Sequence, residues 1–342
     1  MHARQVVLGA MALLLGGCAA RAPVLPETVL ASNALSVEIA GAPFFPQEAY
    51  QCGPAALATV LGHSGLELTP TELAPQVYLP RREGSLQIEL IAATRRHGRI
   101  PVVISPELAA LIAELQAGRP VLVLQNLRLR TWPAWHYAVV VGYDAIKDVL
   151  LMRSGQTKRL ETSTAEFLRT WSLAGRWAIV TLVPGELPAS SEPRRYLEAV
   201  AAMENAGAHS AALVNAYRAA LTRWPRSFVA RFGLANALRS SGELAEAEVT
   251  YRTLLAERPD EPAVVNNLAD VLTGRGCPDE ALALLDQIPD GEGADALGAA
   301  LRKTRAEALA ARGQRGSSCS VASRLQTTAD DAGQSFEEGR FR

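Results

Sequence analysis

A fixed period of 34 residues in the second half of the chain constrains the fold more than any other feature of this sequence. Seven pairs of identical residues share that separation. They are Pro225 and Pro259, Tyr217 and Tyr251, Leu234 and Leu268, Ala235 and Ala269, Leu238 and Leu272, Gly242 and Gly276, and Ala247 and Ala281. A helical unit of this length buries its apolar face only against neighbouring units. We therefore expect an all-α solenoid over residues 194–311.

This period, with small residues where paired helices must approach, resembles that of tetratricopeptide repeats. The resemblance covers about residues 194–291 and implies a groove that binds an extended peptide or a partner helix. We therefore expect a protein partner there, and a purely structural cap on the preceding domain is the alternative. Residues 186–193 are expected to form a linker, residues 292–311 a final helix, and the polar residues 312–342 a disordered tail.

In the first half of the chain, a cysteine stands where a helix is expected to begin. Cys52 is followed by Gly53, Pro54 and an apolar run. Pro54 suits the first turn of a helix, and Gly53 lets the backbone pass closely behind the thiol. Because a helix N-terminus favours negative charge, we expect a lowered pKa and a reactive thiolate at Cys52. A small, buried, structural cysteine is the alternative.

A nucleophilic cysteine needs a base, and the chain contains five histidines. His136 stands at the entrance of the strongly β-forming run Trp135–Tyr143, so a buried strand is expected to hold it near the cysteine. The other histidines are assigned elsewhere: His2 to an export signal, His63 and His97 to helix ends, and His209 to the helical repeats.

Together, Gln47, the Cys-Gly-Pro motif at Cys52 and the strand at His136 resemble the bacteriocin-processing type of cysteine peptidase, family thirty-nine of the papain-like clan. The resemblance covers roughly residues 40–185. It implies Cys52 as the nucleophile and His136 as the general base. It also implies Gln47 as the side-chain donor of the oxyanion hole, beside the backbone N–H of Cys52. Gln51 is a weaker alternative, because Gln47 lies five residues before the cysteine and six is common in the clan.

The sequence departs from this family at the group that orients the histidine. The family has an Asp on the strand after the His, usually in an Asp-Pro pair, whereas Arg153 or Ser154 falls there in this chain. Arg has no acceptor for an imidazole N–H. Ser154 or a backbone carbonyl is therefore the expected orienting group, with Asp144 and Asp148 as outside alternatives. The third group mainly fixes tautomer and orientation, so its loss need not abolish activity, although less efficient turnover is expected.

The order of expected elements predicts a papain-like α+β domain over residues 37–185, with helices first and an antiparallel sheet afterwards. The expected helices are Cys52–Leu61, Thr71–Val77, Ser85–His97, one capped by Ser105 that ends at Gly118, and one opened by a capping box at Ser163. The expected strands are Val37–Ile39, Pro101–Ile104, Pro120–Leu124, His136–Tyr143, Val149–Met152 and Arg176–Leu182. Trp132, Trp135 and Tyr50 are expected to flank the cleft, as substrate walls or as packing at the sheet edge.

The first residues have the pattern of an export signal, with a basic start and an apolar stretch, Val6–Leu15, too short to span a bilayer. Leu15-Gly16-Gly17-Cys18 resembles a bacterial lipobox, which implies lipidation of Cys18. An ordinary signal peptide is the alternative. Ala19 resembles the second residue of lipoproteins sent to the outer membrane. We therefore expect a signal peptide over residues 1–18, a tether over 19–36 and a lipid anchor facing the periplasm.

Charge and spacing exclude several other functions. A formal net charge of −1 without a basic stripe argues against a nucleic-acid partner. No His-x-x-x-His pair or other clustered ligand set is present, so neither a metal nor another cofactor is expected. A bridge between Cys277 and Cys319 is left open. The sequence thus predicts a lipid-anchored periplasmic cysteine peptidase that acts on a peptide or protein substrate, and an inactive peptidase fold that serves as a binding or scaffold lipoprotein is the alternative.

Overall fold

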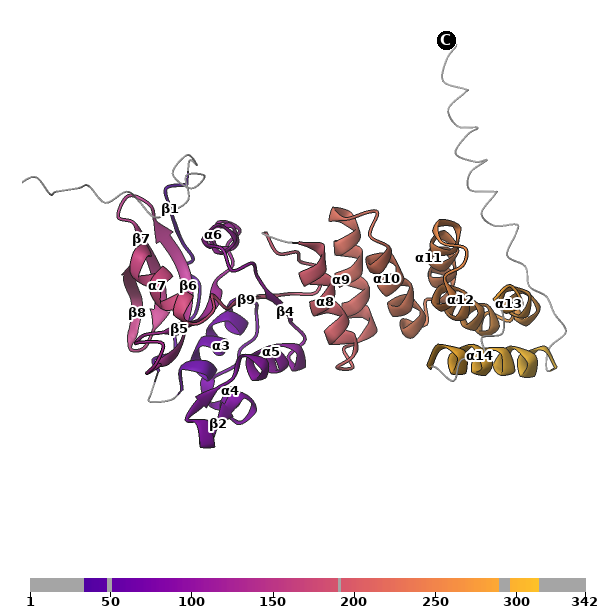
Figure 1. The fold of residues 1–342 in the computed structure, drawn as a ribbon, viewed down its shortest axis with the longest axis horizontal. Helices are drawn as coiled ribbons and strands as arrows, with labels where there is room; N and C mark the ends of the chain where they lie inside the picture. Colours follow the sequence, from indigo (N-terminus) through magenta and orange to yellow (C-terminus); the bar gives the residue numbers. More distant parts are fainter. Residues whose placement is uncertain (1–33, 48–50, 190–191, 289–295, 314–342) are drawn as a thin grey trace, which may run out of the picture. The chain divides into compact units, whose positions relative to one another are not determined.

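The computed structural model describes residues 34–47, 51–189, 192–288 and 296–313. Within them the chain forms two compact units, one built on a sheet and one made of helices (Figure 1). The expected signal peptide, Cys18, Tyr50, Cys319 and most of the expected tether and tail lie outside the described residues. In the described parts, no helix combines the length and apolar character needed to cross a bilayer.

A seven-stranded sheet in the order β4-β9-β5-β6-β7-β8, with β1 paired to β6, forms the centre of the first unit (Figure 1). The pairs β9–β5, β5–β6, β6–β7, β7–β8 and β1–β6 are antiparallel. The strands are β1 (Ser36–Glu38), β4 (Ile100–Val103), β5 (Val121–Asn126), β6 (Trp135–Asp144), β7 (Val149–Ser154), β8 (Thr157–Ser163) and β9 (Ala178–Leu182). The predicted α+β class is confirmed.

Helices cover both faces of this sheet, which explains why β5 is buried along its whole length. On one face, the Thr181 hydroxyl of β9 donates to the carbonyl of Val60 in α3. The β5–β9 register points the side chains of Thr181 and Gln125 to opposite faces of the sheet. On the face opposite α3, Gln125 of β5 donates to Thr170 in α7. The helices of this unit are α3 (Cys52–His63), α4 (Pro70–Val77), α5 (Gln87–Arg96), α6 (Leu108–Gln116) and α7 (Thr164–Leu173), with the short η1 (Pro80–Arg82).

The structure corrects the sequence-based expectations at three places. A hairpin of β2 (Tyr78–Leu79) and β3 (Gly84–Ser85) precedes α5, which begins at Gln87 rather than Ser85. Strand β8 was not predicted, because nearly all of its side chains are exposed and polar and it lacks apolar alternation. Ser105 is not a cap, since α6 begins at Leu108 after Glu107.

The second unit is a stack of helices in which each packs on the next along the chain (Figure 1). The 34-residue period is visible in the backbone, because Gly242 and Gly276 each follow a helix with the same φ of +83°. Tight packing needs Gly233, where a Cβ atom would lie 2.3 Å from the Tyr217 ring. The helices are α8 (Pro193–Glu204), α9 (Ser210–Arg223), α10 (Phe228–Ser241), α11 (Leu244–Glu257), α12 (Pro262–Gly274), α13 (Pro278–Leu285) and α14 (Ala296–Arg312).

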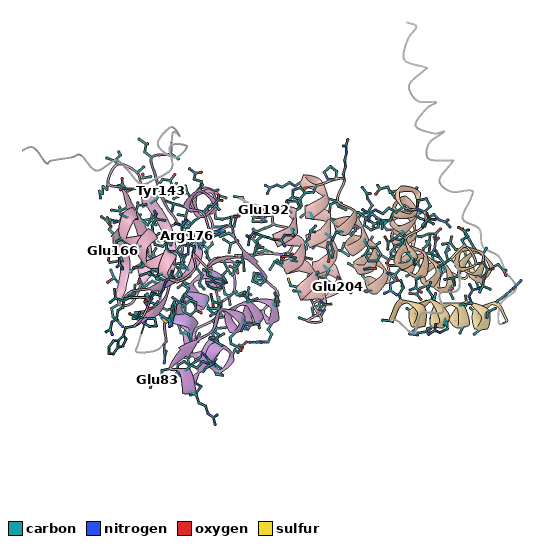
Figure 2. All side chains as sticks on the ribbon, in the orientation of Figure 1. Glu83, Tyr143, Glu166, Arg176, Glu192 and Glu204 are labelled. Atoms are coloured by element: carbon teal, nitrogen blue, oxygen red, sulfur yellow. The ribbon has the colours of Figure 1, made fainter. Side chains whose placement is uncertain are left out.

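Two local contacts matter for the ends of these units. Tyr143 of β6, labelled in Figure 2, donates to the carbonyl of Ala34 and accepts from Gln116 of α6, so the first described residues are held against the sheet. In the helical unit, Cys277 caps α13, is buried and is disulfide-bonded, and its partner lies outside the described residues.

Candidate active site

A cleft of about 1050 Å³ in the first unit brings together side chains from distant parts of the sequence. Cys52, at the start of α3, and Gln47 line it beside Gly155 of the β7–β8 turn. The ends of β5 and β6 contribute a second wall that contains His136 and Trp135. Residues 82–87, from the β2–β3 turn to the start of α5, also line the cleft, and Figure 2 labels Glu83 at this turn.

Cys52 is the first residue of α3, where backbone N–H groups have no partner within the helix. The helix comes unusually close to β3, since a Cβ atom at Gly53 would lie 2.2 Å from Ser85 Oγ. Burial raises the pKa of the Cys52 thiol, although backbone hydrogen bonds from Tyr137, Gly53 and Cys52 itself act to lower it. The expectation of a lowered pKa is therefore wrong for the resting thiol, because desolvation outweighs the helix N-terminus.

His136, near the start of β6, is held through one ring nitrogen. Its Nε2 lies 2.8 Å from Ser154 Oγ on the neighbouring strand β7. This contact leaves Nδ1 as the nitrogen available to a thiol. Burial lowers the pKa of His136, so the imidazole is neutral at neutral pH. The backbone of Tyr137, the residue after His136, forms a hydrogen bond with the Cys52 thiol. This contact connects the start of β6 to the start of α3.

The Gln47 side chain has a fixed direction because both of its ends have backbone partners. Its Oε1 accepts from the N–H of Gly155 at 3.1 Å, and an N–H can only donate. Nε2 is therefore the other end, and it lies 3.4 Å from the carbonyl of Tyr137. The Gln47 N–H also donates to the Gly155 carbonyl at 3.0 Å. Gln47 thus keeps an N–H donor in the cleft beside Cys52.

Residues 39–179 match the family model described as the Peptidase_C39 like family, and residues 194–266 and 238–304 match that of the tetratricopeptide repeat. The chain joins a C39-like domain to tetratricopeptide repeats. Both resemblances inferred from the sequence are thereby confirmed, and the first unit is a cysteine-peptidase-type domain.

Two solved structures that are similar to this chain each cover less than half of it. One is described as a C39-like peptidase from Bacillus anthracis, with 17% identity, a TM-score of 0.36, and coverage of 43% of this chain and 97% of the other. Another is the peptidase domain of Streptococcus ComA, a bifunctional ABC transporter of a quorum-sensing pathway, with 20% identity, a TM-score of 0.34, and coverage of 41% and 98%. No curated protein matches this chain.

Within the C39-like domain, the structure separates the residues that the sequence left as alternatives. Cys52, His136 and Gln47 line one cleft, whereas Gln51 caps α3 and is not among the cleft residues. Ser154 contacts the imidazole as expected of an orienting group. The Asp144 carboxylate instead accepts from backbone N–H groups in the β6–β7 turn, at the far end of β6 from His136.

Arg153 has a structural role in the C39-like domain. Its guanidinium is buried and donates to the carbonyls of Lys158 at 2.6 Å and Ala42 at 3.5 Å. Trp135 lines the cleft, and Trp132 lines a separate, smaller hollow. In the described residues, no group of three or more His, Cys, Asp or Glu side chains is arranged to hold a metal ion.

Sequence reasoning missed the wall formed by β3 and Tyr137. The Tyr137 hydroxyl donates to the Ser85 carbonyl at 3.3 Å, and its ring meets Trp177 edge to face with centroids 6.0 Å apart. Burial raises the pKa of Tyr137, so this phenol stays protonated and remains a donor. The apolar run around Tyr137 signalled a buried strand, but nothing in it indicated that Ser85 would lie opposite.

Proposed function

We propose that the protein hydrolyses peptide bonds through a thioester at Cys52. The observation that carries this proposal is one cleft that contains a thiol at a helix N-terminus, an imidazole held through Nε2 and an amide N–H donor of fixed direction. A nucleophile, a base and an oxyanion donor are the parts that acyl transfer requires. The match to the Peptidase_C39 like family supports the same reaction class.

In the proposed reaction, His136 Nδ1 takes the proton from Cys52 as the sulfur attacks the substrate carbonyl carbon. The Gln47 amide and the Cys52 N–H donate to the oxyanion that forms. When the C–N bond breaks, the imidazolium gives its proton to the leaving amine. A water molecule, deprotonated by His136, then attacks the thioester, and the released thiolate recovers the proton. Ser154 keeps the imidazole oriented throughout.

The pH dependence of Cys52 alkylation tests this arrangement. Because burial raises the pKa of Cys52 and lowers that of His136, thiol and imidazole are both neutral between the two pKa values. Within that window, proton transfer from sulfur to imidazole converts a fraction of the molecules to a thiolate–imidazolium pair. Because this transfer neither takes up nor releases a proton, that fraction and the alkylation rate should be independent of pH. We expect a plateau for iodoacetamide that falls only below about pH 6.5, the ordinary histidine pKa, and rises again above about pH 8.5, that of a free thiol.

The matched variant is His136→Ala, followed by mass spectrometry of the Cys52 peptide in full-length protein. We expect the plateau to disappear and the rate at neutral pH to fall about 100-fold or more. The rate of the variant should rise only as the buried thiol itself ionises. If wild type and variant share one profile that follows the raised pKa of Cys52, the proposed base is wrong.

A binding protein with a peptidase fold is the second candidate function. The observation that favours it is the burial that raises the Cys52 pKa, together with the missing family Asp. A protein of this kind would show identical alkylation profiles in wild type and His136→Ala, so the same experiment separates the two functions.

We further propose that Cys18 carries a lipid that anchors the chain to the outer membrane facing the periplasm, and that the repeats bind a protein partner. The Leu-Gly-Gly-Cys motif supports the first point and the match to tetratricopeptide repeats supports the second. We expect Cys18→Ser to move the protein from the membrane fraction to the soluble fraction and to abolish incorporation of labelled palmitate. If the Cys18→Ser protein stayed in the membrane fraction and still incorporated labelled palmitate, the proposed lipid anchor at Cys18 would be wrong.

A further inference from the structure

An exposed apolar and cationic loop borders the cleft. Residues 127–134, here called the β5–β6 loop, contain two arginines and no acidic residue. Leu129 is 69% exposed and Trp132 is 75% exposed, and Leu127 is also exposed. Large apolar side chains grouped in this way on a folded surface mark an interaction site.

The backbone of the loop is held in place from inside the fold by the side chain of Asn126. Asn126 is 1% exposed, and its Oδ1 accepts from the N–H groups of Arg128 at 3.1 Å and Ala134 at 2.9 Å. Its Nδ2 donates to the Leu129 carbonyl at 3.2 Å. Because the backbone is already ordered, a ligand that covers these side chains loses little affinity to the ordering of the loop.

Charge specifies the ligand. Leu127, Leu129, Trp132, Arg128 and Arg169 of α7 surround a hollow of about 550 Å³. In the described part of the chain, Arg128, Arg130 and Arg169 form no ion pair with a carboxylate. Exposed guanidinium groups beside an indole and two leucines suit a peptide that carries carboxylates next to large apolar residues.

The position of the loop favours a peptide over a membrane surface. Ala134, at the end of the loop, and Trp135, the first residue of β6, line the cleft with Cys52. A polypeptide bound on the loop therefore needs only to continue past these two residues to reach the thiol cleft.

We propose that the β5–β6 loop and Arg169 form a docking surface for an acidic, apolar segment of the substrate polypeptide, outside the bond to be cleaved. The inference that the bound segment belongs to a substrate rests on the proposed peptidase function. The surface would retain the chain to be cleaved and would make its association dependent on salt.

The test measures fluorescence polarisation of fluorescein-labelled synthetic peptides on full-length Cys52→Ala protein, which cannot cleave them. One peptide alternates Glu with Leu and Trp, the second has Lys in place of Glu, and the third has Ser in place of the apolar residues. We expect the first to bind at least about tenfold more tightly than the others and to weaken as salt is raised from about 0.02 to 0.2 M. Trp132→Ala and the double change Arg128→Glu with Arg169→Glu should each weaken it about tenfold.

Ile146→Ala is the matched control, because Ile146 is 82% exposed in the β6–β7 turn and should leave binding unchanged. Circular dichroism of each variant checks that it is folded, and Arg128→Lys, which keeps the charge, should retain most of the binding. Equal binding of the acidic and basic peptides, or binding insensitive to the loop variants, would overturn the proposal. So would loop-dependent binding of phosphatidylglycerol vesicles without peptide discrimination. If the Cys52→Ala protein discriminates between the peptides but the wild-type protein cleaves none of them, only the proposed peptidase function would be overturned.

Discussion

Replacing Cys52 with Ala should abolish peptide hydrolysis, and replacing His136 with Ala should lower kcat by about 10⁴-fold or more. The first change removes the atom that forms the thioester. The second removes the base from a thiol whose pKa is raised by burial, so that little thiolate forms at neutral pH. Because the two groups act as a unit, the double variant should be no worse than Cys52→Ala.

The measurement is hydrolysis of a quenched fluorescent peptide library, with unfolding of each variant followed by circular dichroism. His209→Ala is the matched histidine control, because His209 caps α9 in the repeats without a side-chain cap hydrogen bond. Its activity should equal that of wild type. Hydrolysis by Cys52→Ala at the wild-type rate would show that another group, or a contaminating enzyme, performs the reaction.

Removing the donor at Gln47 should lower kcat by about 10²- to 10³-fold. Gln47→Glu is the sharper of two variants, because it keeps an oxygen for the Gly155 N–H and replaces the donating amide with an acceptor. Gln47→Ala loses the Gly155 contact as well. If the effect is electrostatic, Gln47→Glu should be at least as inactive as Gln47→Ala while folding like wild type.

Gln51→Ala provides the control for this prediction, since Gln51 is the alternative donor that the sequence left open. It should change kcat little, because Gln51 lies at the helix cap and outside the cleft lining. Iodoacetamide labelling of Cys52 should stay normal in the Gln47 variants, because alkylation forms no oxyanion. A larger loss of kcat in Gln51→Ala than in Gln47→Glu would reverse the assignment.

Much of the candidate site could be predicted from local sequence, because local rules specify it. Cys52 at a helix start and His136 at a strand entrance follow from capping chemistry and β-propensity. The direction of the Cys52 pKa could not be predicted in the same way. It depends on how much protein covers the sulfur, and that cover comes from segments remote in the chain such as β6 and the residues around Ser85.

Gln47 illustrates the same limit. The family resemblance implied a donor at Gln47, but the direction of its amide is set by Gly155, which is 108 residues away. The β2–β3 hairpin and polar strand β8 escaped prediction because neither has an apolar period, and tertiary pairing alone makes them strands.

The sequence by itself determined the two folds and the residue types of the site. The 34-residue period and the buried apolar strands are repeated local patterns, and each repeat or strand has only one way to bury its apolar face. Only the tertiary structure decided that Ser154 meets the imidazole, that Gln47 rather than Gln51 faces the cleft, and that a cationic apolar loop adjoins it. These three features depend on contacts between residues that are distant in sequence. The shape and burial of their side chains determine such contacts, and their spacing along the chain does not.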